Sequence, residues 1–138
     1  ATSLTPTDPA REATLLAKKV EAGADFALSQ PCFDPEAAAT FIERRRSSDA
    51  AEIPVLLGIQ PLFNARNAEF LHNEVPGIRI PQRYRERMKA AQDPQAEGVK
   101  IALEVIDELR SAVDGVYVIP AFGRYDLAAE ILDAVQAT

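Results

Sequence analysis

Apolar residues along the chain follow two patterns in turn, and these predict helices and buried strands. Leu15, Leu16, Val20 and Ala24 recur at the spacing of one helical face, which is typical of a helix packed on a core. The run PVLLGIQP at residues 54–61 is largely apolar throughout, which is typical of a parallel strand covered on both faces. The predicted helices span residues 7–22, 35–47, 64–73, 82–91, 94–113 and 125–137, and the predicted strands span residues 25–31, 53–61 and 116–120.

Aspartate, proline and glycine mark where these helices begin and end. Asp8 precedes Pro9, and Asp34 precedes Pro35. The aspartate side chain can cap the helix, and proline is harmless in the first turn because its missing N–H has no partner there anyway. Gly23 then ends the first helix, because glycine readily adopts the left-handed conformation that closes a helix.

The order of these elements is typical of a parallel α/β fold. One helix precedes the first strand, one separates the first two strands, and three separate the second strand from the third. Crossovers between parallel strands are right-handed and place helices against the sheet. Three parallel strands leave two open edges and poorly covered faces. We therefore predict that residues 1–138 form a single partial domain, about three βα units of a larger repeating α/β structure.

Composition narrows the classes of function. The formal net charge of −6 argues against general nucleic-acid binding, which needs clustered lysine and arginine to neutralise phosphates. No apolar run approaches the roughly 20 residues that span a bilayer, and residues 1–10 do not resemble a signal peptide. We expect a cytoplasmic protein with neither a nucleic-acid nor a membrane partner.

Cysteine and histidine are too few for several kinds of site. Cys32 is the only cysteine and His72 the only histidine, which excludes an internal disulfide and a cysteine-based metal cage. A zinc enzyme or a Ser-His-Asp hydrolase built on one histidine is equally unexpected, so no metal site is predicted. Cys32 is interpreted as an adaptable packing residue.

Polar residues follow each predicted strand. Ser29 and Gln30 end the first, Gln60 and Asn64 follow the second, and Arg124 follows the third. In a (β/α)₈ barrel this edge forms the active-site face. The carboxamide of Gln30 can donate and accept at once, which suits the edge of a heterocycle. The spacing equally allows Gln30 to do no more than satisfy backbone groups at the rim.

Two neighbouring segments carry a specific resemblance to a known family. KKVEAGADF at residues 18–26 and SQPCFD at residues 29–34 resemble the KVxAGAxxxxTQxxFD segment of the methylenetetrahydrofolate reductase family. Further matches occur in chain order at residues 54–61, 64–71, 75–81, 97–109 and 122–124. In detail, residues 67–77 and 120–125 resemble the branch of the family that is fused to a homocysteine S-methyltransferase domain.

The resemblance implies a (β/α)₈ TIM barrel that holds FAD and reduces 5,10-methylenetetrahydrofolate to 5-methyltetrahydrofolate with NADH or NADPH. Residues 1–138 correspond to the C-terminal part of that barrel. The family's proton-donating glutamate and the aspartate beside the flavin lie in earlier strands. We therefore predict no catalytic residue in this chain and no reductase activity by the chain alone. The implied partners are a folate and either an N-terminal half of the barrel or further copies of the chain.

The resemblance also assigns binding residues one at a time. Lys19 matches a lysine that contacts the phosphate region of the flavin. Gln30 matches a glutamine that meets the edges of the folate and the flavin. Arg124 resembles an arginine after the last strand, which suits a substrate carboxylate or a pyrophosphate.

Two further substrate-binding positions depart from the family pattern. Asn67 falls where a folate-contacting glutamine is frequent, and it keeps the carboxamide on a side chain one methylene shorter. Leu71 falls where an aromatic residue commonly stacks on the folate or nicotinamide ring. Leucine can pack at that position but cannot stack, and the neighbouring Phe70 is the available aromatic residue.

Two other interpretations are open at this point. The chain could be a non-catalytic α/β binding or assembly module that pairs with a partner chain or with itself. It could also be a segment of another α/β barrel with a different substrate. Binding of FAD or folate would distinguish a reductase from an assembly module. The identity of the ligand bound at the strand ends would distinguish it from a segment of another barrel.

Overall fold

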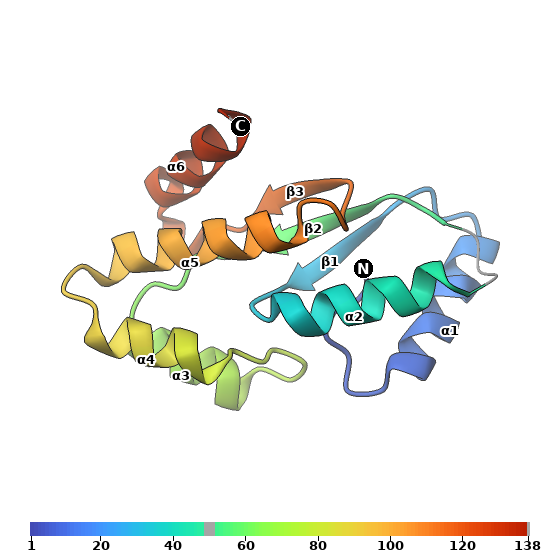
Figure 1. Ribbon diagram of the computed structural model, residues 1–138, viewed down its shortest axis with the longest axis horizontal. Helices are drawn as coiled ribbons and strands as arrows, with labels where there is room; N and C mark the ends of the chain where they lie inside the picture. The colour runs from blue at the N-terminus through green and yellow to red at the C-terminus, as the bar shows by residue number, and fades with distance from the viewer. Residues whose placement is uncertain (49–51, 138) are drawn as a thin grey trace.

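In the computed structural model, which describes residues 1–48 and 52–137, helices and strands follow one another in the predicted order (Figure 1). The elements are α1 (Pro9–Glu21), β1 (Ala27–Pro31), α2 (Pro35–Arg46), β2 (Val55–Ile59), α3 (Ala65–Glu74), α4 (Gln82–Ala90), α5 (Pro94–Leu109), β3 (Gly115–Val118), the 3₁₀ turn η1 (Ala121–Gly123) and α6 (Tyr125–Gln136). The predicted helices and strands are confirmed, although β1, β2 and α5 are shorter than predicted. Within residues 1–48 and 52–137, no helix is long and apolar enough to cross a membrane.

Side-chain caps fix the starts of the helices. Four helices share one kind of cap, in which a side chain accepts a hydrogen bond from the backbone N–H three residues further on. The capping residues are Asp8, Asp34, Asn64 and Asp93. Each bond satisfies one of the donors that a helix start leaves without an intrahelical partner. Gly23 adopts a φ of 104° just after α1, as predicted for a residue that ends a helix.

The three strands form a parallel sheet in the order β1-β2-β3. Leu28 lies opposite Leu56, and the register becomes irregular between Leu28 and Pro31. The outer edge of β1 is not fully open, because the Thr2 N–H donates to the Leu28 carbonyl and the Gln30 N–H donates to the Thr2 carbonyl, each at 2.9 Å. Thr2 therefore occupies the place of a neighbouring parallel strand. Among the described residues, no strand pairs with the outer edge of β3.

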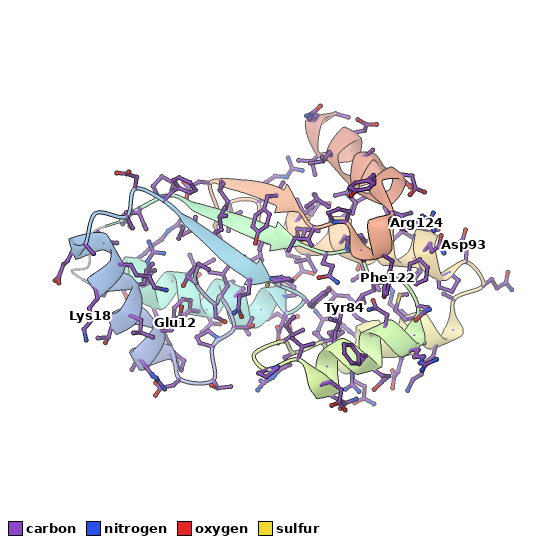
Figure 2. All side chains as sticks on the ribbon, turned by 180° about the vertical axis from the view of Figure 1, so that it is seen from behind. Glu12, Lys18, Tyr84, Asp93, Phe122 and Arg124 are labelled. Carbon is purple, nitrogen blue, oxygen red and sulfur yellow. The ribbon has the colours of Figure 1, made fainter. Side chains whose placement is uncertain are left out.

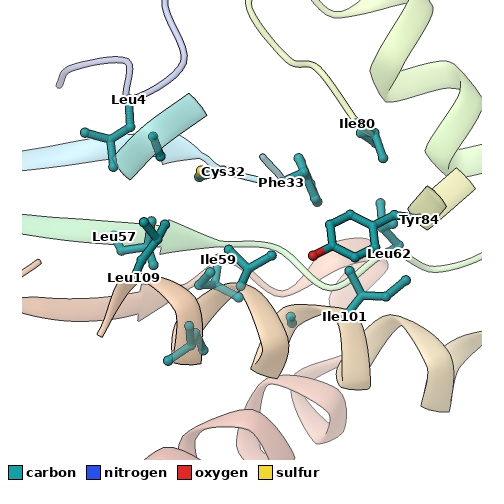
Figure 3. Packing of buried hydrophobic residues seen from close by; sticks show 14 of the residues in the cluster. Leu4, Cys32, Phe33, Leu57, Ile59, Leu62, Ile80, Tyr84, Ile101 and Leu109 are labelled. Carbon is teal, nitrogen blue, oxygen red and sulfur yellow. The ribbon is translucent and has the colours of Figure 1, made fainter. Parts of the chain in front are cut away.

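Helices cover one face of the sheet and leave the other open. Leu57 and Ile59 of β2 lie beside Ile101 and Leu109 of α5, and all four are buried (Figure 3). Seen from behind, β1 and β2 are not crossed by a helix (Figure 2). Leu28, whose side chain is 38% exposed, shows that apolar positions of the sheet remain accessible to solvent.

A second layer of packing joins α3 and α4 to α5. The buried Tyr84 ring of α4 lies beside Leu62, Ile80 and Ile101 (Figure 3). Arg87 of α4 also forms ion pairs with two glutamates of α5. Partly exposed ion pairs contribute about 0–1 kcal/mol each, so burial of the Tyr84 ring is the stronger contribution to this contact.

The backbones of α5 and of the loop after β2 approach each other closely at Gly98. A Cβ atom added at Gly98 would lie 1.9 Å from the carbonyl oxygen of Leu62. Only glycine therefore permits α5 to press against this loop. The loop leads directly into α3, so this contact positions the residues that follow the end of β2.

Replacing Gly98 with alanine is expected to destabilise the protein, although alanine favours a helix by about 1 kcal/mol over glycine. The new Cβ would overlap the Leu62 carbonyl, and overpacking of this kind costs roughly 1–3 kcal/mol or more. Chemical denaturation measures the difference. Gly115→Ala is the control, since its Cβ would meet only the end of the Leu56 side chain, and we expect a smaller loss. An unchanged or raised free energy of unfolding for Gly98→Ala would contradict the close contact.

Candidate functional site

The strand ends bring several of the predicted site residues to one edge of the sheet. Gln30 lies in the last residues of β1, Asn67 follows β2 in the first turn of α3, and Arg124 follows β3. Figure 2 shows Arg124 and Phe122 together at this end of the molecule, with Lys18 at the opposite end. The edge predicted to carry the function is therefore assembled, but not all of the predicted residues belong to it.

Hydrogen bonds between side chain and backbone tie the three strands together just before this edge. The buried Ser29 hydroxyl accepts a bond from the Gly58 N–H and donates one to the Gln30 carbonyl, each at 2.8 Å. The Tyr117 hydroxyl donates to the Ser29 carbonyl, and burial raises the pKa of Tyr117. A Cβ at Gly58 would lie 2.8 Å from the Ser29 carbonyl oxygen. Glycine at this position lets the strands approach closely enough to form these bonds.

These bonds hold the Gln30 backbone while its side chain stays exposed. The Gln30 N–H donates to Thr2 and its carbonyl accepts from Ser29. The side-chain oxygen lies near Gly77, 3.4 Å from a Cβ added there. Among the described residues, the Gln30 carboxamide forms no hydrogen bond. The side chain does not satisfy backbone groups at the rim, so both its donor and its acceptor are available to a ligand.

An aromatic hollow of about 380 Å³ opens beyond the ends of β2 and β3. Two of its rings, Phe63 and Phe122, lie with centroids 4.9 Å apart and planes tilted by 48°. Phe70 is 57% exposed and Phe122 is 69% exposed. Concave sites lined by aromatic rings with a few polar groups are typical of small-molecule binding. The hollow is lined by Phe63, Asn64, Arg66, Asn67, Phe70 and Phe122.

Two asparagines build the rim of the hollow at the start of α3. The Asn64 side chain accepts the Asn67 N–H at 2.8 Å, and the Asn67 side-chain oxygen accepts the Phe63 N–H at 3.1 Å. The pair resembles a capping box, in which two side chains satisfy backbone donors reciprocally. The Asn67 oxygen therefore has a structural role, whereas its amide N–H₂ group forms no hydrogen bond with any described residue.

Phe122 is held in an unusual backbone conformation. Its φ is 55° and its ψ is 30°, in the left-handed region that costs an L-residue roughly 1–2 kcal/mol. The turn is fixed by the Arg124 N–H, which donates to the carbonyl of the buried Ala121 at 3.0 Å. Strain of this kind persists where the surrounding structure imposes it, and it is frequent at functional sites.

Arg124 lies at the predicted edge but is already paired. Its guanidinium forms a bidentate ion pair with Asp126, at 2.9 and 2.6 Å, and also donates to the Gln95 side chain. The hydrogen bonds from Arg124 lower the pKa of Asp126 to about 2. Asp126 therefore remains charged at neutral pH, and a ligand carboxylate would have to compete with it for Arg124.

Two other predicted residues lie away from the hollow. Lys19 belongs to the last turn of α1, which leads to the start of β1, and its ammonium donates to the Ala1 carbonyl at 2.6 Å. Leu71 is 7% exposed and belongs to the core. The neighbouring Phe70 faces the hollow in its place.

Burial also raises the pKa of the Cys32 thiol to about 12, as expected for a packing residue.

The sequence pattern did not assign a binding role to Phe63, Arg66 or Phe122. All three follow shortly after the end of a strand, which is the same signal that selected Gln30 and Arg124. Apolar residues at strand ends are most often packing residues, so the pattern alone does not mark Phe63 or Phe122 as site residues. Exposure of the aromatic rings, which a sequence pattern does not record, distinguishes them from the core.

Known proteins resemble the chain in sequence and in fold. A model of the methylenetetrahydrofolate reductase family matches residues 3–136. Methylenetetrahydrofolate reductase 2 of Schizosaccharomyces pombe is 33% identical over 114 residues, and the match spans 79% of this chain but only 18% of that protein. An uncharacterised Clostridium thermocellum protein, which binds two copies of 5-methyl-5,6,7,8-tetrahydrofolic acid, has a similar structure. It shows a TM-score of 0.66 at 16% identity, over 94% of this chain and 52% of its own. The predicted fold class, part of a TIM-barrel-like α/β fold, is confirmed.

Substitutions at Phe122 measure the backbone strain. Phe122→Ala removes the ring and its contact with Phe63 but keeps a side chain at a left-handed φ. Phe122→Gly also removes the strain, which is worth roughly 1–2 kcal/mol, against roughly 0.5–1 kcal/mol of extra chain entropy in the unfolded state. We expect the glycine variant to be up to about 1 kcal/mol more stable than the alanine variant. Thermal and urea unfolding test this order, and a more stable alanine variant would refute it.

Proposed function

The chain belongs to the methylenetetrahydrofolate reductase family, and on that premise we propose that its aromatic hollow binds the pteridine ring of a folate. The observation that carries the proposal is the pair of exposed rings, Phe70 and Phe122, in a hollow whose rim holds a carboxamide, Asn67. A planar heterocycle stacks on aromatic faces and hydrogen-bonds through its edge. The Clostridium thermocellum protein binds 5-methyl-5,6,7,8-tetrahydrofolic acid, which supports the same class of ligand here.

The polar groups at the edge suit the pteridine, which carries both donors and acceptors. The Asn67 amide N–H₂ group can donate to a ring nitrogen or carbonyl. Gln30, with its carboxamide unpaired among the described residues, can donate and accept in the same contact. In the proposed site Phe70 supplies the stacking ring that the family pattern places at Leu71, because Leu71 is buried in the core.

The described residues do not by themselves fit a flavin. Lys19, predicted to contact its phosphate region, lies in the last turn of α1 and donates to the Ala1 carbonyl, whereas Gln30 lies at the C-terminal end of β1. The Lys19 ammonium is thus already paired with a backbone carbonyl. We propose that the FAD contacts and the NAD(P)H site of the family reaction are completed by residues outside this chain. The chain's own residues then bind and orient the folate, and the flavin, when bound, supplies the hydride chemistry.

A second function is favoured by the uncovered sheet face. Phe26, which directly precedes β1, is 58% exposed, and Leu28 of β1 is also partly exposed. Exposed apolar groups on a sheet are typical of a surface that another chain covers. In this alternative the chain is a non-catalytic assembly module that pairs with a partner, such as the rest of a barrel, or with itself.

Binding of 5-methyltetrahydrofolate to the purified chain, measured by isothermal titration calorimetry, tests the proposal. Stacking on an aromatic ring contributes roughly 1–3 kcal/mol per base in nucleic-acid complexes, so we expect Phe70→Ala to weaken binding by about tenfold, which is about 1.4 kcal/mol. Phe26→Ala is the matched control, because it removes an exposed ring that does not line the hollow. We expect that variant to bind as the unchanged chain does.

The outcomes separate the two functions. A chain that binds no folate, or that loses affinity equally in both variants, would contradict the proposed site. Association of the chain with itself without folate binding, seen by analytical ultracentrifugation, would favour the assembly module. Retention of FAD by the chain alone, seen as flavin absorbance after dialysis, would contradict the proposal that the flavin site is completed elsewhere.

A further inference from the structure

Two arginines near the hollow differ in what they contact. Arg66 lines the hollow, is exposed, and forms neither a hydrogen bond nor an ion pair with any residue in ranges 1–48 and 52–137. Arg124 is held by the Asp126 carboxylate and the Gln95 side chain. Of the two, Arg66 therefore has its five N–H donors available.

Stability does not explain an arginine at this position. Arg66 stands in the first turn of α3, where no acidic residue is present and where a positive charge opposes the helix dipole. Four other helices have an acidic residue in the first turn: α1, α2, α5 and α6. Residues that break a local rule without a structural gain are expected at functional sites.

The hollow is large enough for the ring system of a folate but not for its acidic tail. About 380 Å³ is close to the lower limit for small-molecule pockets, which is roughly 300 Å³. A pteridine fits such a volume, whereas the p-aminobenzoyl-glutamate tail of a folate has to leave it over the rim. That tail ends in carboxylates, and a guanidinium binds a carboxylate through two parallel hydrogen bonds.

Because the chain is negatively charged overall, an acidic ligand needs a positive group close to its carboxylates. The chain has a formal net charge of −6, which repels an acidic ligand on average. Glu69, on the same helix as Arg66, is already paired with Arg85 and Lys89. The hydrogen bond and charge of Lys89, together with Arg85, lower the pKa of Glu69 in spite of its partial burial. Glu69 thus stays ionised and bound to α4, and does not occupy Arg66.

We propose that Arg66, and not Arg124, binds the carboxylates of the substrate's acidic tail. The inference rests on the proposed folate function of the hollow and adds to it a determinant of specificity. Arg66 makes the site selective for pterins that carry a glutamate tail. The Arg124 guanidinium is neutralised by Asp126, and its backbone N–H closes the turn that holds Phe122 beside the hollow.

The test compares two ligands on matched variants of the chain by calorimetry. The ligands are 5-methyltetrahydrofolate, which has the tail, and 6-methyltetrahydropterin, which lacks it. We expect Arg66→Gln to weaken binding of the folate by about tenfold, which is about 1.4 kcal/mol, and to leave binding of the pterin within twofold. Arg66→Lys should recover part of the loss, because it restores the charge without the planar fork.

The control is Arg79→Gln, which removes one positive charge from an exposed arginine outside the hollow that has no partner among the described residues. It should change neither affinity. Equal losses for both ligands in Arg66→Gln, no loss, or a tail-specific loss in Arg124→Gln instead would overturn the role of Arg66. Binding of the pterin by the unchanged chain decides the proposed function separately. If neither ligand binds, the proposed function fails and the role of Arg66 fails with it.

Discussion

The site depends on the contact between α5 and the loop after β2, where Gly98 lies against the backbone of Leu62. A close backbone contact transmits position more rigidly than side-chain packing, because no rotamer can absorb a shift. Phe63 follows Leu62 directly, and Asn64 then starts α3 with its cap. The wall of the hollow that comes from β2 and α3 is thus positioned by the helix that also covers β2.

The other wall comes from β3 and is fixed by different interactions. Hydrogen bonds from Ser29 and Tyr117 join the three strands near their ends, so β3 cannot shift relative to β2 without breaking buried bonds. The turn beyond β3 then holds Phe122 at a left-handed φ. The ring is placed in advance of any ligand, which reduces the ordering cost of binding. The strained backbone of Phe122 is thus held by rigid surroundings, and these keep the ring in one position before a ligand binds.

The sequence predicted what depends on local chemistry and missed what depends on distant contacts. Helix starts at Asp8 and Asp34 were predictable because cap and helix lie within a few residues. The parallel bridge at Thr2 was not, since a single paired residue leaves no periodic pattern. The sequence could predict only one partner of Arg124. Asp126 is two residues away along the chain, whereas Gln95 is brought close only by the fold. The family resemblance assigned Arg124 to a ligand without showing that its guanidinium is already paired.

The comparison of Leu71 with Phe70 shows the limit of assigning a residue role from the family resemblance alone. Adjacent residues of a helix point about 100° apart, so the packing of α3 against α4 decides which of the two faces the core. Leu71 is buried and Phe70 lines the hollow, so a chemical role can move by one residue while the helix stays in place. The same holds for the cation: the position after β3 is occupied by an internal ion pair, and Arg66 on α3 is the available one. Packing and pairing of the side chains therefore decide which groups at this edge are available to a ligand.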